Sequence, residues 1–201
     1  MSVPRLAVFF LLGTVVLTTG LVGCSGTNEV TGGSSQVRVL LTDAPSDSIE
    51  SANVTISRVY LTSDAGPHVD VMPAGDPSVT YDLLDLRNGV EALLADRVVP
   101  AGTYGQLRLV VESADVTLVP GLTFEDGTNF RSLKVPSGMQ SGIKVQLATP
   151  IDADPGEITI VVVDFDVNQN FVLQGATGTT VNDVLFTPLL QEKRRDGLAM
   201  P

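Results

Sequence analysis

The sequence has few of the side chains that enzymes use for chemistry near neutral pH. It contains one histidine, one cysteine and no tryptophan among 201 residues. A zinc site with two or more His or Cys ligands is excluded by these numbers, because protein zinc sites draw most of their ligands from these two types. A Ser-His-Asp arrangement would have to use His68 as its base. His68 lies in the turn-rich stretch 65–68, where an exposed loop histidine is the simpler interpretation. We therefore predict that the protein is not an enzyme.

Basic residues are also scarce. Twelve Lys and Arg stand against 23 Asp and Glu, which gives a formal net charge of −11. Proteins that bind nucleic acid need clustered Lys and Arg to contact phosphates, and the one basic run here, Lys193-Arg194-Arg195, is short and lies near the C-terminus. We therefore predict no nucleic-acid partner, and we interpret residues 191–201 as a polar, solvated tail.

A long apolar run near the N-terminus contrasts with this acidity. Arg5 is the only charged side chain before Glu29, and the run over residues 6–23 follows it directly. Its length approaches the roughly 20 residues of a membrane-spanning helix. Its position and its ending on a small residue before Cys24 favour a signal peptide instead.

The ending of this run, Leu21-Val22-Gly23-Cys24, resembles the bacterial lipobox. That motif has an aliphatic residue, a small or aliphatic one, then Gly, Ala or Ser before an invariant Cys. The resemblance implies that the Cys24 thiol receives a diacylglycerol, that residues 1–23 are removed and that the new α-amine is acylated. A lone cysteine in an exported protein has no disulfide partner, which supports this interpretation. Several acyl chains on one residue give durable anchoring.

Residues 24–35 are predicted to be a lipidated, flexible tether. The stretch 25–35 is small, polar and rich in glycine, as is typical of flexible linkers. A coil of this length holds the folded domain about 15–20 Å from the bilayer on average. We therefore predict a membrane-anchored, extracytoplasmic location. By analogy with lipoprotein sorting, Ser25 directly after the cysteine points to the outer membrane if the host has two membranes.

Short β-branched runs separated by turn residues fill the predicted domain, residues 36–190. Polar and apolar side chains alternate within these runs, which indicates strands with one face in the core and one in water. In 103–112, for example, Leu107, Leu109 and Val111 are expected to point inward. The expected strands lie at 36–42, 52–62, 103–112, 122–124, 130–133, 142–148, 157–167 and 183–190.

Two local signals refine this prediction. Asp126-Gly127 predicts a hairpin between 122–124 and 130–133. Asn88 as an N-cap, an apolar face and Pro100 as a stop predict one short helix before Pro100. The fold class predicted from these patterns is all-β, an antiparallel two-sheet β-sandwich with one short helix.

Two resemblances bear on the fold. The segment Val99-Pro100-Ala101-Gly102-Thr103-Tyr104 resembles the P-x-G-x-Y entry of prealbumin-like sandwiches, which implies a glycine turn and a tyrosine packed at the start of the next strand. Five blocks are similar to a bacterial lipoprotein family described as domain of unknown function 4382. This second resemblance implies a prealbumin-like or immunoglobulin-like sandwich and an envelope location, and it implies no activity. The blocks are VRVLLTDAPSD (37–47), VTISRVYL (54–61), LLDLRNGVEALLADRVVPAGTYGQLRLVVE (83–112), LKVPSGMQSGIKV (133–145) and DFDVNQNFV (164–172).

Acidic and amide side chains near residue 166 make the best candidate for a metal site. Alternation places Asp164, Asp166 and Asn168 on one face of a strand end, with Phe165 and Val167 on the core face. Oxygen ligands of this kind suit calcium. Side chains two residues apart in a strand are about 6.6–6.8 Å apart, so they share an ion only if the chain bends. The segment also lacks the glycine and terminal glutamate of a calcium loop.

The alternative for this segment is an outward polar face on which one Asp accepts hydrogen bonds from neighbouring amides. We predict that no cofactor is required, with calcium as the candidate ion. Asp43 and Asp47, after the first expected strand, are interpreted as turn and cap residues.

The anchor, the tether, the sandwich and the lack of a nucleophile–base set together predict a function. We expect a non-catalytic, membrane-anchored surface lipoprotein that binds or scaffolds a carbohydrate or protein ligand in the cell envelope. The alternative is a carboxylate-dependent hydrolase acting on envelope or external polysaccharide. That alternative needs two carboxyl groups about 5–10 Å apart across a cleft.

Overall fold

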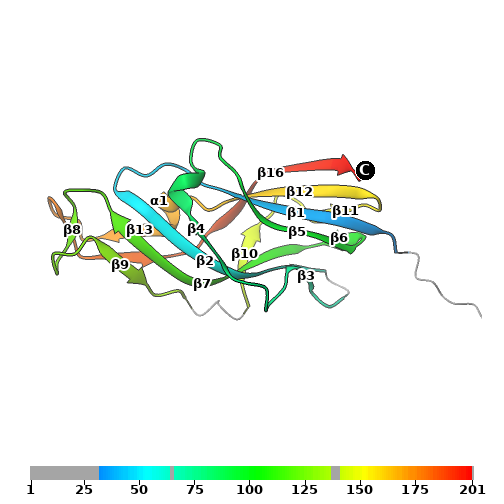
Figure 1. Cartoon of the computed structure of the whole chain (residues 1–201), viewed down its shortest axis with the longest axis horizontal. Coiled ribbons are helices and arrows are strands. Elements are labelled where there is room, and N and C mark those ends of the chain that lie inside the picture. Colours follow the sequence, from blue (N-terminus) through cyan, green and yellow to red (C-terminus); the bar gives the residue numbers. More distant parts are fainter. Residues whose placement is uncertain (1–31, 64–65, 137–140, 201) are drawn as a thin grey trace, which may run out of the picture. The chain divides into compact units, whose positions relative to one another are not determined.

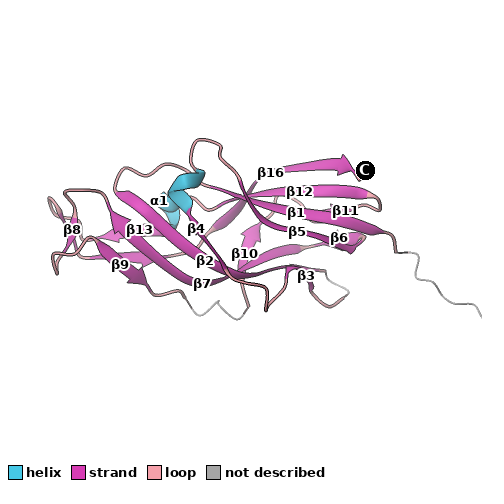
Figure 2. Ribbon diagram, in the orientation of Figure 1, coloured by secondary structure: helices cyan, strands magenta, loops and turns pink. Residues whose placement is uncertain are grey.

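A computed structural model of the chain describes residues 32–63, 66–136 and 141–200. Most elements in this part are β-strands, as the sequence predicted (Figures 1 and 2). In chain order they are β1 Ser34–Thr42, β2 Ile49–Thr62, β3 Val69–Met72, β4 Val79–Asp82, the 3-10 helix η1 Leu83–Leu86, β5 Ala92–Pro100, β6 Gly102–Tyr104, β7 Gln106–Leu118, β8 Thr123–Phe124, β9 Phe130–Leu133, β10 Ile143–Gln146, β11 Ile151–Ala153, β12 Glu157–Asp164, the helix α1 Val167–Asn170, β13 Phe171–Gln174, β14 Thr180–Val181, β15 Asp183–Phe186 and β16 Leu190–Ala199.

The main sheet curls towards closure. Its strands follow the order β3-β2-β7-β10-β16-β12-β1-β5, while β4 joins β2 and β9 joins β7. The strands at the two ends of this order, β3 and β5, contact each other but do not pair along the described residues. The result is a nearly closed, barrel-like sheet, so the predicted two-sheet sandwich is wrong in its layering. The prediction of purely antiparallel pairing is also wrong, because β1 and β12 are parallel.

The core lies inside this curled sheet. Leu107, Leu109 and Val111 of β7 are fully buried, as their alternation predicted. On β2, Val54 and Ile56 are buried together with Val59 and Leu61, although strict alternation puts these two pairs on opposite faces. Extra residues in β2, among them the one between Ile56 and Arg58, shift the register against β7. Such bulges turn the later side chains to the core face. Each fully buried aliphatic side chain contributes about 1.5–3 kcal/mol to stability.

The helix expected before Pro100 is a strand. Residues Ala92–Pro100 form β5, which pairs antiparallel with β1. Asn88 has a positive φ of 62° and lies in a turn instead of capping a helix. The apolar spacing in this stretch fits either structure, and the pairing with β1 decides between them because tertiary contacts override local propensity. The one α-helix in the described part is α1, four residues long.

The C-terminal segment is also not the predicted tail. β16 pairs antiparallel with β12, from Glu157 opposite Ala199 to Asp164 opposite Gln191. Its side chains after Leu190 are mostly exposed, which explains its polar composition, since the pairing is made by the backbone. At the other end, β1 begins at Ser34 within the predicted tether.

Two turn predictions have different outcomes. The turn at Asp126-Gly127 is present, with the Gly127 amide donating to the Phe124 carbonyl at 2.9 Å. The strands beside it do not form the predicted hairpin, because β8 pairs with β14 and β9 pairs with β7. The packing predicted for the tyrosine is confirmed, because Tyr104 is buried and its hydroxyl donates to the Pro100 carbonyl at 2.6 Å. Its predicted position is not, because Tyr104 ends the short strand β6 and does not begin a strand.

Candidate functional site

Three aspartates, Asp43 from one part of the sequence and Asp164 and Asp166 from another, gather where β1 and β12 end. These two strands are parallel, with Thr42 opposite Asp164, so their carboxyl ends lie at the same edge of the sheet. Asp43 follows β1, Asp164 ends β12, and Asp166 precedes α1 as its N-cap. We call Asp43, Asp164 and Asp166 the acidic corner.

Asp43 is the most deeply buried member of the acidic corner, with 2% of its surface exposed. Its Oδ1 atom accepts a hydrogen bond from the Val167 amide at 2.8 Å, and Oδ2 is buried with no hydrogen-bond partner among the described residues. Burial raises the pKa of this carboxyl from 3.8 to about 7, and the charges of Asp164 and Asp166 add to the rise. The sequence suggested a local turn or cap role for Asp43, whereas its buried side chain bonds to the distant helix α1, whose N-cap is Asp166.

Asp164 and Asp166 have different surroundings. One oxygen of Asp164 is buried without a partner in the described part of the chain, and the other lies 3.8 Å from the Lys193 ammonium. Burial raises the pKa of Asp164, Lys193 lowers it and the charge of Asp166 raises it. Asp166 accepts hydrogen bonds from the amides of Asn168 and Gln169 at the start of α1.

The predicted metal ligands are only partly brought together. Phe165 and Val167 are fully buried, as predicted for the core face. Asp164 and Asp166 line one small cavity of about 40 Å³ with Gln169, Leu189 and Gln191. The side-chain amide of Asn168 is not part of this lining and donates to the Pro45 carbonyl at 2.6 Å. No group of three or more His, Cys, Asp or Glu in the described residues is arranged to hold a metal ion. Calcium binding stays a prediction.

The raised pKa of Asp43 predicts a pH-dependent stability. The folded protein keeps the proton on Asp43 up to a pH of about 7, whereas the unfolded chain releases it near 3.8. The free energy of unfolding should therefore fall as the pH rises from about 4 to about 7. A difference of about three pH units corresponds to about 4 kcal/mol. In Asp43→Asn this contribution should disappear, so the variant should be more stable than wild type above pH 7 by up to that amount.

Urea unfolding at several pH values measures this effect. Asp43→Ala is the control: it also lacks the carboxyl, so its stability should be as independent of pH as that of Asp43→Asn, but it should be about 1–3 kcal/mol less stable than Asp43→Asn at every pH because it removes the acceptor for the Val167 amide. An Asp43→Asn variant that keeps the wild-type slope of stability against pH would show that another group titrates.

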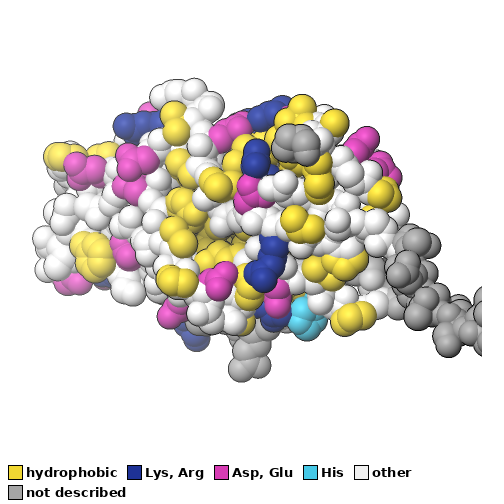
Figure 3. Space-filling model, turned by 45° about the vertical axis from the view of Figure 1, so that its right-hand side comes forward, with side chains coloured by type: hydrophobic (Ala, Val, Ile, Leu, Met, Phe, Trp, Pro, Cys, Tyr) yellow, Lys and Arg dark blue, Asp and Glu magenta, His cyan; other side chains and the backbone are white. Residues whose placement is uncertain are grey.

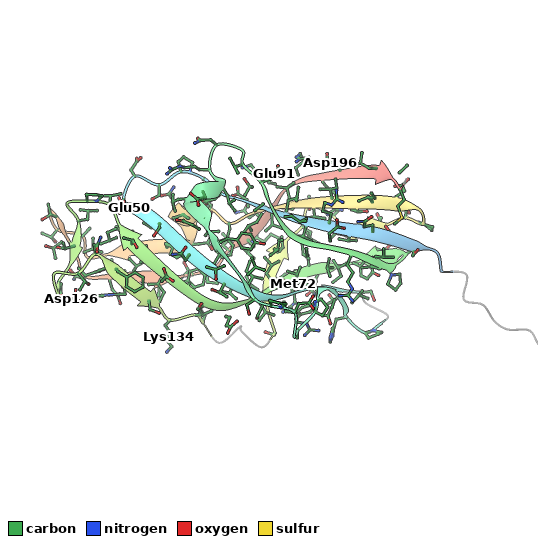
Figure 4. The ribbon with its side chains drawn as sticks, in the orientation of Figure 1. Glu50, Met72, Glu91, Asp126, Lys134 and Asp196 are labelled. Carbon is green, nitrogen blue, oxygen red and sulfur yellow. The ribbon has the colours of Figure 1, made fainter. Side chains whose placement is uncertain are left out.

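A second candidate site lies where the main sheet fails to close. Beside the contact between β3 and β5, the edges of β4 and β5 flank a cleft of about 470 Å³, which we call the seam cleft. Hydrophobic side chains gather in the middle of one face of the molecule (Figure 3), and Figure 4 labels Met72 at the end of β3. The apolar residues that line the seam cleft include Val71, Met72, Val79, Tyr81, Leu93 and Leu94.

A bulge in each end strand explains why the seam stays open. On β3, Met72 and Asp70 pair with consecutive residues of β2, which leaves Val71 as the extra residue. On β5, Ala95 and Leu93 pair with consecutive residues of β1, so Leu94 is the extra residue. Bulges interrupt the ladder and increase the local twist. The seam cleft could not be predicted from the sequence while the β5 segment was interpreted as a helix.

Hydrogen bonds link β5, which lines the seam cleft, to β4 and to β1. The Tyr81 hydroxyl donates to the Leu93 carbonyl at 2.9 Å and so links β4 to β5. Asp96 accepts two hydrogen bonds from the Arg38 guanidinium at 2.8–2.9 Å. The Leu93 side chain itself points away from the core and is 54% exposed.

These features define a β-rich domain with a nearly closed sheet, a buried acidic corner and an apolar cleft at the seam. Residues 34–182 match the family described as Domain of unknown function (DUF4382), and the chain belongs to this family. No curated protein and no solved structure matches the chain, so the prealbumin-like fold stays a prediction. His68 is exposed, as expected.

The N-terminal predictions fall on a part of the chain that the structure does not describe. Cys24, the signal peptide over 1–23 and most of the tether lie outside the described residues. Within those residues, no helix has the length and apolar character needed to cross a membrane.

Proposed function

We propose that this protein is a non-catalytic, membrane-anchored lipoprotein of the cell envelope that binds a ligand in the seam cleft. The cleft carries the binding part of the proposal. Its volume of about 470 Å³ lies within the range of roughly 300–1,000 Å³ typical of ligand sites, which are mostly apolar with a few polar groups. The anchoring part rests on the resemblance of Leu21-Val22-Gly23-Cys24 to the lipobox.

The chemistry of the cleft lining supports a binding role over a catalytic one. Its polar side chains are Asp76, Asp96 and Tyr81, and the lining holds no Ser, Cys, His or Lys. Asp96 is ion-paired with Arg38, and the Tyr81 hydroxyl donates a hydrogen bond to the Leu93 carbonyl. Nucleophilic catalysis needs a nucleophile beside a base, and this lining has no such pair.

The alternative, a carboxylate-dependent hydrolase, would have to use the acidic corner. Two of its carboxyl groups have raised pKa values, which a general acid requires. Its cavity of about 40 Å³ is far smaller than a sugar unit needs, and Asp43 is closed off from solvent. We therefore favour the binding role. Hydrolysis of an envelope polysaccharide by wild type, lost in Asp164→Asn, would support the alternative.

The binding proposal predicts a specific loss in Leu93→Lys. The change puts a charge into the apolar cleft at an exposed position, so the fold should tolerate it, while ligand affinity should fall about tenfold or more, equivalent to about 1.4 kcal/mol. Leu185→Lys is a matched control, because Leu185 is similarly exposed (48%) on β15 and does not line the cleft.

The measurement has two parts. Full-length protein in detergent is screened on a glycan array and against solubilised envelope components, and every ligand found is titrated against wild type and both variants. Binding that Leu93→Lys weakens and Leu185→Lys leaves unchanged supports the seam cleft. No binding above background, or binding that both variants share with wild type, contradicts the proposal.

A further inference from the structure

We propose that the occupant of the seam cleft is an extended, basic and apolar peptide segment that pairs with β5 as an additional strand. This inference rests on the binding function proposed above and specifies its ligand class. It follows from the backbone edges at the seam, the width of the opening and the charge of its lining.

The backbone edges at the seam are the first observation. β5 pairs with β1 on one side and has no strand partner on the other side among the described elements, and β4 likewise pairs only with β2. Unpaired strand edges present rows of N–H and C=O groups that template another strand. A peptide offers matching groups at the strand repeat of about 3.3 Å per residue, which a sugar or an acyl chain does not.

The width of the opening is the second observation. The Tyr81 side chain reaches from β4 to the Leu93 carbonyl on β5. A side chain that spans the seam in this way keeps the two backbones well beyond the spacing of about 4.8 Å at which strands pair. A strand that enters would take the Leu93 carbonyl with its own N–H and displace the Tyr81 hydroxyl. Tyr81 therefore competes with the peptide for one acceptor.

Side chains and charge supply the third observation. Leu93 is largely exposed on β5 beside the cleft, and Val79 is partly exposed on β4. Branched apolar residues on an added strand would pack against them as cross-strand pairs. The lining holds the carboxylates of Asp76 and Asp96 and no Lys or Arg. Asp96 is already paired with Arg38 of β1, so the charge that would attract a basic residue on the peptide and repel an acidic one is mainly that of Asp76.

The test begins with a library of random nine-residue peptides displayed on phage and selected on full-length protein in detergent. Enriched sequences should alternate apolar residues and carry Lys or Arg. A synthetic peptide of the enriched sequence should bind about tenfold more weakly to Leu93→Lys and unchanged to Leu185→Lys. Its affinity for Tyr81→Phe should rise about threefold to tenfold, because the competing hydroxyl is gone.

N-methylation distinguishes strand pairing from side-chain binding. The same peptide, methylated on alternate amides so that one edge cannot donate, should lose binding when the methylated edge faces β5. A methylated series that binds as well as the parent, or a Tyr81→Phe variant that binds more weakly, overturns the strand-pairing inference. If no peptide is enriched but a glycan or lipid binds in a Leu93-dependent way, the peptide inference fails and the binding function stands. If nothing binds, both fail.

Discussion

Deleting residues 191–201 should leave most of the protein insoluble. The deletion removes β16 after Leu190 and uncovers one edge of β12 along its whole length, from Glu157 to Asp164. The segment Ile158-Thr159-Ile160-Val161-Val162-Val163 within β12 is uncharged and consists entirely of β-branched residues. Short segments of this composition on an open edge pair with further copies and aggregate. The expected loss therefore comes from the newly open edge as well as from missing hydrogen bonds.

To check this prediction, the truncated and the full-length protein are expressed separately under the same conditions, and their soluble fractions and thioflavin T signals are compared. Lys193→Gln in the full-length chain is the control, because it removes a charge of the segment and keeps the β16 backbone. This control should stay soluble. A truncated protein that is soluble and melts at the wild-type temperature would mean that β16 is dispensable, as a solvated tail would be.

The contrast between strand positions and strand partners explains which parts of the fold could be predicted. Side-chain alternation reports which residues of one segment share a face, and it placed Leu107, Leu109 and Val111 correctly in the core. It carries no information on which strand lies beside which. The parallel pairing of β1 with β12 joins residues more than a hundred positions apart, and the hairpin at Asp126-Gly127 was wrong for the same reason.

Bulges limited the prediction in a second way. An extra residue at Ser57, Val71 or Leu94 changes the face of every later side chain in its strand, and no local residue pattern marks these positions. The seam cleft depends on two of these bulges, so sequence reasoning did not find it.

The acidic corner was found in part. The pattern around Asp166 drew attention to Asp164 and Asp166, because acidic residues at alternate positions are visible in one segment. Asp43 was interpreted as a turn residue, since its burial arises only when η1, β12 and α1 close over the end of β1. The sequence does place Asp43 directly after a strand with buried alternate residues. A polar residue at such a position can be exposed in a turn or covered by the next layer of the fold, and the sequence alone does not distinguish the two.

Replacing Cys24 by alanine should abolish lipid attachment completely. The thioether to the diacylglycerol needs the cysteine sulfur, and no other cysteine exists in the chain. Without it the precursor should stay uncleaved or be cleaved elsewhere. Wild type should incorporate labelled fatty acid and partition into the detergent phase, while Cys24→Ala should take up no label. Ser25→Ala is the control, because it alters the neighbouring residue and keeps the thiol.

The second measurement is the mass of the mature N-terminus. Cleavage before Cys24 with a diacylglyceryl and an acyl group attached is the expected result. Wild-type protein that takes up no label and retains residues 1–23 would contradict the lipobox interpretation. The apolar run, being close to the length of about 20 residues needed to cross a bilayer, would then have to hold the domain at the membrane as a peptide span. Ligand binding at the seam cleft should be the same in either case, because the cleft is built from residues 71–96, so the anchor and the binding site can be tested independently.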